Sequence, residues 1–119
     1  MRFEKRSGIL LGTINQNKRV YSMFLIDLVF TAPNDVVDKY VAAHRQYLSS
    51  HYDQGLFLLG GRKVPRTGGV ILSRHNTLAE VEQIFNSDPL VLASAASYTV
   101  MEFELAMLSP ELKALSFIQ

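Results

Sequence analysis

The chain has 119 residues, of which 48% are hydrophobic and none is cysteine, and its formal net charge at pH 7 is +1. This length and apolar content are typical of a single domain with a substantial core. The lack of cysteine excludes a disulfide framework, a zinc–thiolate site and a cysteine nucleophile.

The charge is unevenly distributed along the chain. Residues 1–22 carry five basic residues against one acidic residue, a net +4, whereas residues 23–119 carry seven against ten, a net −3. A nucleic-acid-binding domain would carry a basic stripe on its folded part, so this distribution argues against one. No apolar run approaches the ~20 residues of a membrane span, and apolar residues 9–11 are too few for a secretory leader. We therefore expect a cytoplasmic protein with no nucleic-acid or membrane partner.

The first part of the chain differs in character from the rest. Residues 1–22 are polar, basic and largely aperiodic, which indicates an N-terminal extension ahead of an ancestral start at Met23. The alternative is an ordered strand over residues 9–14. The chain then divides into an extension at 1–22, an α+β domain at 23–107 and a tail with a short helix at 108–119.

Four apolar runs predict β-strands. The first run has apolar residues on both faces, which is typical of a sheet that is covered on both sides. In a chain this small, helices can cover one face, and a second subunit is the natural cover for the other. The predicted strands span residues 23–31, 56–59, 70–73 and 97–107.

Two main helices separate these strands. Apolar residues at spacings of three and four predict one amphipathic helix over residues 34–53, with Gly55 as a suitable left-handed cap. Thr77 and Glu80 have the spacing of a capping box, so a second helix is expected to begin there. Pro89 resists helical backbone at the residue before it and ends that helix.

The order of elements is therefore β-α-β-β-α-β, the ferredoxin-like split βαβ arrangement. The expected fold class is α+β, with an antiparallel sheet and both helices on one face. The other sheet face is apolar and uncovered, and so large an exposed patch is unusual for a monomer. We expect a homodimer in which two sheets pack face to face and form a barrel.

His44 is the first candidate for chemistry, because it lies on the apolar face of the first helix, four residues after Val41 and four before Leu48. A histidine in such a place is more often a core side chain bonded to a carbonyl group. Asp88 is the second candidate, and its simpler explanation is loop chemistry at a helix end. Spacing alone cannot bring the two together, but helices side by side on one sheet face make contact possible. A carboxylate on one imidazole nitrogen would fix the tautomer and leave the other nitrogen basic.

The other histidines are weaker candidates. His51 is too distant from His44 for an ordinary metal pair, and His75 follows a strand in a turn, where we expect it to be solvated. No cluster of side chains has recognisable metal-ligand spacing. No serine, threonine or cysteine nucleophile is marked by a motif, so acid–base chemistry is preferred over acyl transfer.

Glycines and cations lie together after the second strand. Gly60 and Gly61 do not belong to a phosphate-binding loop, since no GK[ST] motif follows, but they permit tight turns or close approach of a ligand to the backbone. Arg62, Lys63 and Arg66 follow in a loop. They indicate either a solvated loop, which is the simpler interpretation, or a cationic rim that attracts an anionic substrate.

Several short motifs follow one another over roughly residues 23–107. They are HRQYL with His44, GLFLLGG at 55–61, GGVIL at 68–72, LAEVEQIFNSDPL at 78–90 and a closing strand around TVMEFEL. In this order and spacing they resemble the YciI-like (YCII-related) family of small dimeric α+β barrel proteins.

The resemblance implies a site. In that family, a histidine of the first helix and an aspartate of an Asp-Pro pair after the second helix form a proposed active-site dyad, and these positions match His44 and Asp88. Relatives of the fold include dehydrochlorinases and muconolactone isomerases, so the resemblance implies a homodimer that uses no cofactor or metal and transfers protons as a lyase or isomerase. Most members have no assigned reaction. The alternative, a non-catalytic dimeric domain that binds a small ligand, stays open.

One position departs from the family pattern. Many members carry an arginine shortly before the histidine, where this chain has residues 41–43, Val-Ala-Ala. Arg45 follows instead and is expected to point away from the pocket, which argues against anion binding by that route. From the glycines and the cationic loop after the second strand, the expected substrate-binding residues are Gly60, Gly61 and Arg62.

Overall fold

The structure is a computed structural model that describes residues 22–114. The expected N-terminal extension lies almost entirely outside the described residues, and the alternative strand at residues 9–14 lies wholly outside them. Phe24–Glu102 form one compact unit, which carries all the residues of the site. In the other unit, the short helix expected in the tail is present, with Ser109 as its cap and Pro110 at its first position.

The elements follow the expected order, with the first helix divided in two and a short helix added before the last strand. They are β1 (Ser22–Phe30), α1 (Asn34–Val37), α2 (Val41–Asp53), β2 (Phe57–Arg62), β3 (Gly68–Ser73), α3 (Leu78–Asn86), α4 (Pro89–Leu92), β4 (Ala96–Glu104) and α5 (Pro110–Lys113).

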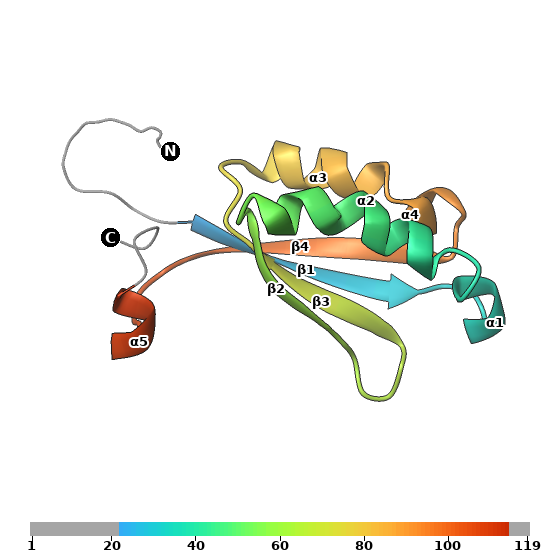
Figure 1. The fold of residues 1–119 in the computed structure, drawn as a ribbon, viewed down its shortest axis with the longest axis horizontal. Coiled ribbons are helices and arrows are strands. Elements are labelled where there is room, and N and C mark those ends of the chain that lie inside the picture. Colours follow the sequence, from blue (N-terminus) through green and yellow to red (C-terminus); the bar gives the residue numbers. More distant parts are fainter. Residues whose placement is uncertain (1–21, 115–119) are drawn as a thin grey trace. The chain divides into compact units, whose positions relative to one another are not determined.

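The four strands form one antiparallel sheet in the order β2-β3-β1-β4. Helices α2, α3 and α4 lie together on one face of this sheet (Figure 1). Helix α2 leads into β2 at one edge of the sheet, and α4 leads into β4 at the other edge. The segment with α2 and the segment with α3 and α4 therefore lie side by side in one helical layer. The fold is the ferredoxin-like βαββαβ arrangement of the α+β class.

The single helix expected over residues 34–53 is wrong in one respect, because the chain turns between α1 and α2. The N–H groups of Lys39 and Tyr40 bond to carbonyl groups three residues back, at Val36 and Val37, rather than four back. This tighter pattern ends the α-helical ladder. A new ladder starts where the His44 N–H bonds to the Tyr40 carbonyl group. Helix α2, which carries the candidate histidine, therefore has its own hydrogen-bond ladder and does not continue α1.

Local signals in the sequence are confirmed at two helix ends. Thr77 and Glu80 form a complete capping box at the start of α3. Gly55 follows α2 with a φ of 74°, a left-handed conformation that glycine adopts without strain. Both features satisfy backbone groups that a helix end would otherwise leave without partners.

Strand β2 is longer than its apolar run. It continues through Gly60 and Gly61 to Arg62, which pair with residues 69–71 of β3. The sequence pattern ends at Leu59 because glycine carries no apolar side chain, although its backbone can still form the ladder. This extension places both glycines in the sheet beneath α2.

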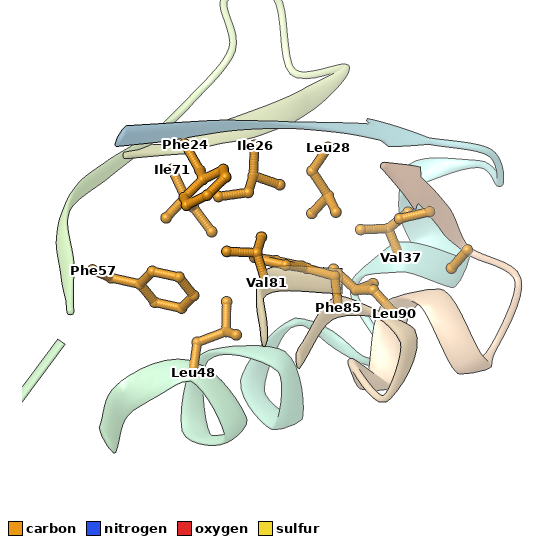
Figure 2. Packing of buried hydrophobic residues seen from close by; sticks show 12 residues of the cluster. Phe24, Ile26, Leu28, Val37, Leu48, Phe57, Ile71, Val81, Phe85 and Leu90 are labelled. Atoms are coloured by element: carbon orange, nitrogen blue, oxygen red, sulfur yellow. The ribbon is translucent and has the colours of Figure 1, made fainter. Parts of the chain in front are cut away.

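The core lies between the helices and the face of the sheet that they cover (Figure 2). Phe24, Ile26 and Leu28 alternate along β1 and are almost completely buried. They meet Val81 and Phe85 of α3, which are both 0% exposed. Removing each such side chain from water contributes about 1.5–3 kcal/mol. Leu48 of α2 and Leu90 of α4 belong to the same core, so these two helices, which position the candidate site, also pack against the sheet.

The opposite face of the sheet is not covered by any helix of the Phe24–Glu102 unit (Figure 1). Along β1 the residues that alternate with the buried ones point to this face, among them Val29, which is 40% exposed. Leu59 of β2 and Met101 of β4 are 58% and 61% exposed. An open apolar sheet face is what the sequence predicts.

Candidate active site

The loop between α3 and α4 fixes the position of Asp88. Pro89 is the first residue of α4, and Asp88 precedes it in an extended conformation as the N-cap. The Asp88 carboxylate accepts a hydrogen bond from the Leu90 N–H at 3.1 Å, and its side chain is fully buried. The interpretation of Asp88 as helix punctuation is therefore correct, and it leaves most of the carboxylate available for another donor.

That donor is His44 of α2. Its Nδ1 lies 2.9 Å from one carboxylate oxygen of Asp88 and 2.8 Å from the other. An ionised carboxylate can only accept hydrogen bonds, so Nδ1 carries the hydrogen in this contact. The other ring nitrogen, Nε2, is then the basic one when the ring is neutral. The two sequence candidates thus meet across 44 positions of the chain.

A pocket of about 500 Å³ opens beside His44, whose side chain is 15% exposed. Asp88 does not line this pocket, so it contacts His44 from the protein side while another edge of the ring faces the cavity. The walls come from α2, from β1, β2 and β3 and from the loop that joins β2 to β3. The lining residues on α2 are Val41, His44, Arg45, Leu48, Ser49, Tyr52 and Asp53.

The expectation that Arg45 points away from the pocket is wrong. The lining residues of α2 form two adjacent rows with four-residue spacing, 41-45-49-53 and 44-48-52, and Arg45 belongs to the first. The sequence pattern captured mainly the row of His44, because the other row is largely polar. The face of α2 that borders the cavity is therefore wider than its apolar stripe.

Cationic side chains border the pocket, as one of the two interpretations of the loop predicts. Arg62 and Arg66 line it together with Arg45, against one acidic lining residue, Asp53. No hydrogen bond or ion pair joins the guanidinium group of Arg45 or Arg62 to another residue within 22–114. This excess of positive charge favours an anionic ligand.

The other two cations of the region have protein partners. Arg66 bonds to Asp38 at 2.6 Å, and its guanidinium lies 5.5 Å from the ring centre of Phe30. Lys63 does not line the pocket; its Nζ lies 2.5 Å from a carboxylate oxygen of Asp27. Arg45 and Arg62 are thus the arginines of the pocket that keep their charge available for a ligand.

Gly60 and Gly61 also line the pocket, as expected for backbone that a ligand approaches. They differ in surroundings. A methyl group added at Gly61 would have no atom within 4 Å, whereas one added at Gly60 would overlap the hydroxyl of Tyr52. The absence of a side chain matters sterically at Gly60.

The expectation that His75 is solvated is wrong. Its side chain is buried, with Nδ1 2.5 Å from the Ser73 hydroxyl and Nε2 3.3 Å from Nδ1 of His51. Burial lowers the pKa of His75 to about 4, and the charges of His51 and Arg74 act in the same direction. The turn after β3 folds back under α2, which a local sequence pattern does not reveal. Within residues 22–114 no group of three or more histidine, aspartate or glutamate side chains is arranged to hold a metal ion.

The family model of the YCII-related domain matches residues 23–104. The chain belongs to this family. The match covers the strands, helices α1 to α4 and both members of the His44–Asp88 pair, and it agrees with the extent expected from the sequence motifs.

A similar solved structure is 5-chloro-2-hydroxyhydroquinone dehydrochlorinase from Burkholderia phenoliruptrix, in complex with 2,5-dihydroxybenzoquinone. The TM-score is 0.58 at 19% sequence identity, over 71% of this chain and 93% of that chain, so the likeness establishes a shared fold. No curated protein matches the sequence. In the described part of this YCII-related protein, no helix has both the length and the apolarity needed to cross a membrane.

Proposed function

We propose that this YCII-related protein is a lyase or isomerase that moves protons on a small organic molecule without a cofactor. The observation that carries this proposal is the contact of a fully buried carboxylate, Asp88, with Nδ1 of a histidine whose ring borders a cavity of about 500 Å³. A cavity of this size suits a ligand of one or two rings.

His44 would act as the general base and then as the general acid. Its Nε2 takes a proton from an acidic C–H or O–H group of the substrate, and the resulting imidazolium is stabilised by Asp88. The same Nε2 returns the proton at another atom in an isomerase, or releases it after a leaving group departs in a lyase. Asp88 does not line the pocket and contacts it only through His44, so it is a positioning residue, which holds the ring and its tautomer.

The substrate would be anionic or become so during the reaction. Arg45 and Arg62 line the pocket without a protein partner among the described residues. Such cations stabilise negative charge that develops on an oxygen when a proton is removed. The known ligand of the related dehydrochlorinase, an oxygenated ring, supports this class of substrate.

A direct test combines turnover with a measurement on His44 itself. Chloride release from 5-chloro-2-hydroxyhydroquinone should be catalysed by the wild type and lost in His44→Gln. Nitrogen-15 spectra of the neutral ring should show a hydrogen on Nδ1 in the wild type and a mixture of tautomers in Asp88→Asn.

The outcomes separate catalysis from simple binding. A His44→Gln variant that keeps the wild-type rate would contradict the proposal. If the wild type binds small oxygenated rings but turns none over, and His44→Gln changes only affinity, the non-catalytic binding domain is the correct description.

We also propose that the protein is a homodimer formed through the open face of the sheet. Support comes from the exposed apolar side chains of three different strands, Val29, Leu59 and Met101. Packing two such faces together removes this surface from water and leaves the pocket, which lies on the helix-covered side, accessible.

A further inference from the structure

Tyr52 borders the pocket but has no place in the proton transfer described above. It lies on α2 eight residues after His44, in the same row, so the helix separates the two Cα atoms by ~12 Å. Its ring contacts Phe57, with 5.3 Å between the ring centres. The pocket therefore extends over two helical turns, with an imidazole at one position and a phenol at the other.

Among the described residues, the hydroxyl of Tyr52 has no hydrogen-bond partner, in contrast to the hydroxyls of two other tyrosines of this unit. Tyr47 donates a hydrogen bond to the Ile84 carbonyl group at 2.7 Å, and the Tyr98 hydroxyl lies 2.7 Å from the Asn86 side-chain oxygen. No such bond joins the Tyr52 hydroxyl to any residue within 22–114. Burial raises the pKa of Tyr52, so the group remains a protonated donor at neutral pH.

Gly60 makes room for this hydroxyl. A methyl group at position 60 would overlap the Tyr52 oxygen and would also lie 3.2 Å from the Val70 carbonyl oxygen and 3.3 Å from a side-chain carbon of Ile71. The tyrosine oxygen is the end of a side chain that can rotate, whereas the backbone of β3 is fixed in the sheet. Any residue larger than glycine at position 60 would therefore displace the hydroxyl.

We propose that Tyr52 is a substrate-positioning residue, which donates a hydrogen bond to an oxygen of the bound ligand, and that Gly60 is required to seat its hydroxyl. The ligand class is a compact oxygenated ring whose reacting end lies at His44 and whose acceptor oxygen lies at Tyr52. Arg45 and Arg62 balance its negative charge. This assignment rests on the proposed function for the location of the ligand, but it does not require turnover.

The test is a binding measurement with 2,5-dihydroxybenzoquinone as the probe, by calorimetry on the full chain. Tyr52→Phe and Gly60→Ala should each weaken binding about three- to tenfold, the range expected for one hydrogen bond. The double variant should bind no more weakly than the weaker single variant, because both changes remove the same contact. Tyr47→Phe, which loses a hydrogen bond outside the pocket, is the matched control and should bind like the wild type.

Each outcome decides the assignment. Wild-type affinity in Tyr52→Phe, or losses that add fully in the double variant, would overturn the role of the hydroxyl. Absence of probe binding to the wild-type protein would overturn the ligand class. Failure of the proposed catalysis is seen separately, as a His44→Gln variant with the wild-type rate, and it would leave a Tyr52-dependent binding site in place.

Discussion

The carboxylate of Asp88 holds two elements at once. It accepts the Nδ1 hydrogen of His44 from α2 and the backbone N–H of Leu90 at the start of α4. One buried group thus fixes both the orientation of the imidazole and the beginning of a helix. His44 lies on a helix and Asp88 is the N-cap of another helix, which suits a residue that must present one nitrogen to a ligand.

This double role predicts different costs for two substitutions of Asp88. Asp88→Ala removes the helix cap, worth about 1 kcal/mol, and leaves a part-buried N–H of His44 without an acceptor, worth about 1–3 kcal/mol. Asp88→Asn retains an oxygen that can cap α4, so it should cost roughly half as much. Urea unfolding of both variants measures these differences in the free energy of unfolding.

The same two substitutions of Asp88 also distinguish an effect on stability from an effect on activity. Turnover should fall strongly in Asp88→Asn as well as in Asp88→Ala, because neither side chain stabilises an imidazolium. Equal losses of stability in the two variants would show that the carboxylate has no capping role. Full activity in Asp88→Asn would show that it does not act through His44.

The surroundings of Gly68, at the start of β3, predict that an added methyl group there destabilises the protein more than one at Gly61. Its φ is 156°, and a methyl group there would overlap the backbone carbonyl group of Leu28, which cannot rotate away as a side chain could. Gly68→Ala should therefore lower the free energy of unfolding by about 2–4 kcal/mol. Gly61→Ala, with no atom within 4 Å of the added methyl group, should change it by less than about 0.5 kcal/mol. Similar unfolding midpoints for the two variants would contradict this account.

The buried His75 predicts a specific loss of stability in acid. Its pKa is about 4 in the folded protein, against 6.5 for a histidine exposed to water, so between these values the unfolded chain binds more protons. The contribution of His75 is fully present above pH 6.5 and falls as the pH drops from 6.5 to about 4. The loss should be on the order of 2 kcal/mol, since the ring is not fully shielded from water.

The measurement compares unfolding at pH 7 and pH 4.5 in the wild type and in His75→Gln. The difference between the two pH values should be smaller in the variant, because carboxylates titrate alike in both proteins. His51→Gln should retain most of the wild-type difference, since burial is the largest cause of the lowered pKa and the charge of His51 is secondary. An unchanged pH dependence in His75→Gln would contradict the assignment.

The order of elements and the class of fold were predictable because they depend on local chemistry. The apolar run of β1, the capping box at Thr77 and the glycine at position 55 act within a few residues, and the structure confirms all three. The turn at residues 38–40 was not predictable from periodicity, since the apolar spacing continues across it. The extension of β2 through its glycines was also missed, because pairing with β3 and not side-chain pattern defines it.

The candidate site, like the fold, was predictable from the sequence in some respects and not in others. His44 and Asp88 were identified from family resemblance together with the expected topology, whereas spacing could not show that they touch. Arg45 was misplaced because it lies on the largely polar row of α2, and His75 was misplaced because it packs against α2, which is distant from it in sequence. The position of Tyr52, eight residues after His44, agrees with the apolar face of the helix, but only the structure shows that it lines the cavity and that its hydroxyl lies against Gly60.

The last prediction concerns dimer formation through the open face of the sheet. Met101 lies on β4 and is 61% exposed, and the proposed dimer would bury it among apolar side chains of the partner. Met101→Lys would place a charge in that apolar surface, which costs more than about 1.4 kcal/mol and so raises the dissociation constant of the dimer at least ~10-fold. Leu92→Lys, in α4 and 69% exposed, adds the same charge on the helical side and should leave the dimer intact. Light scattering across a dilution series measures both. A monomeric wild type at high concentration, or equal dissociation of the two variants, would show that this face does not form the interface.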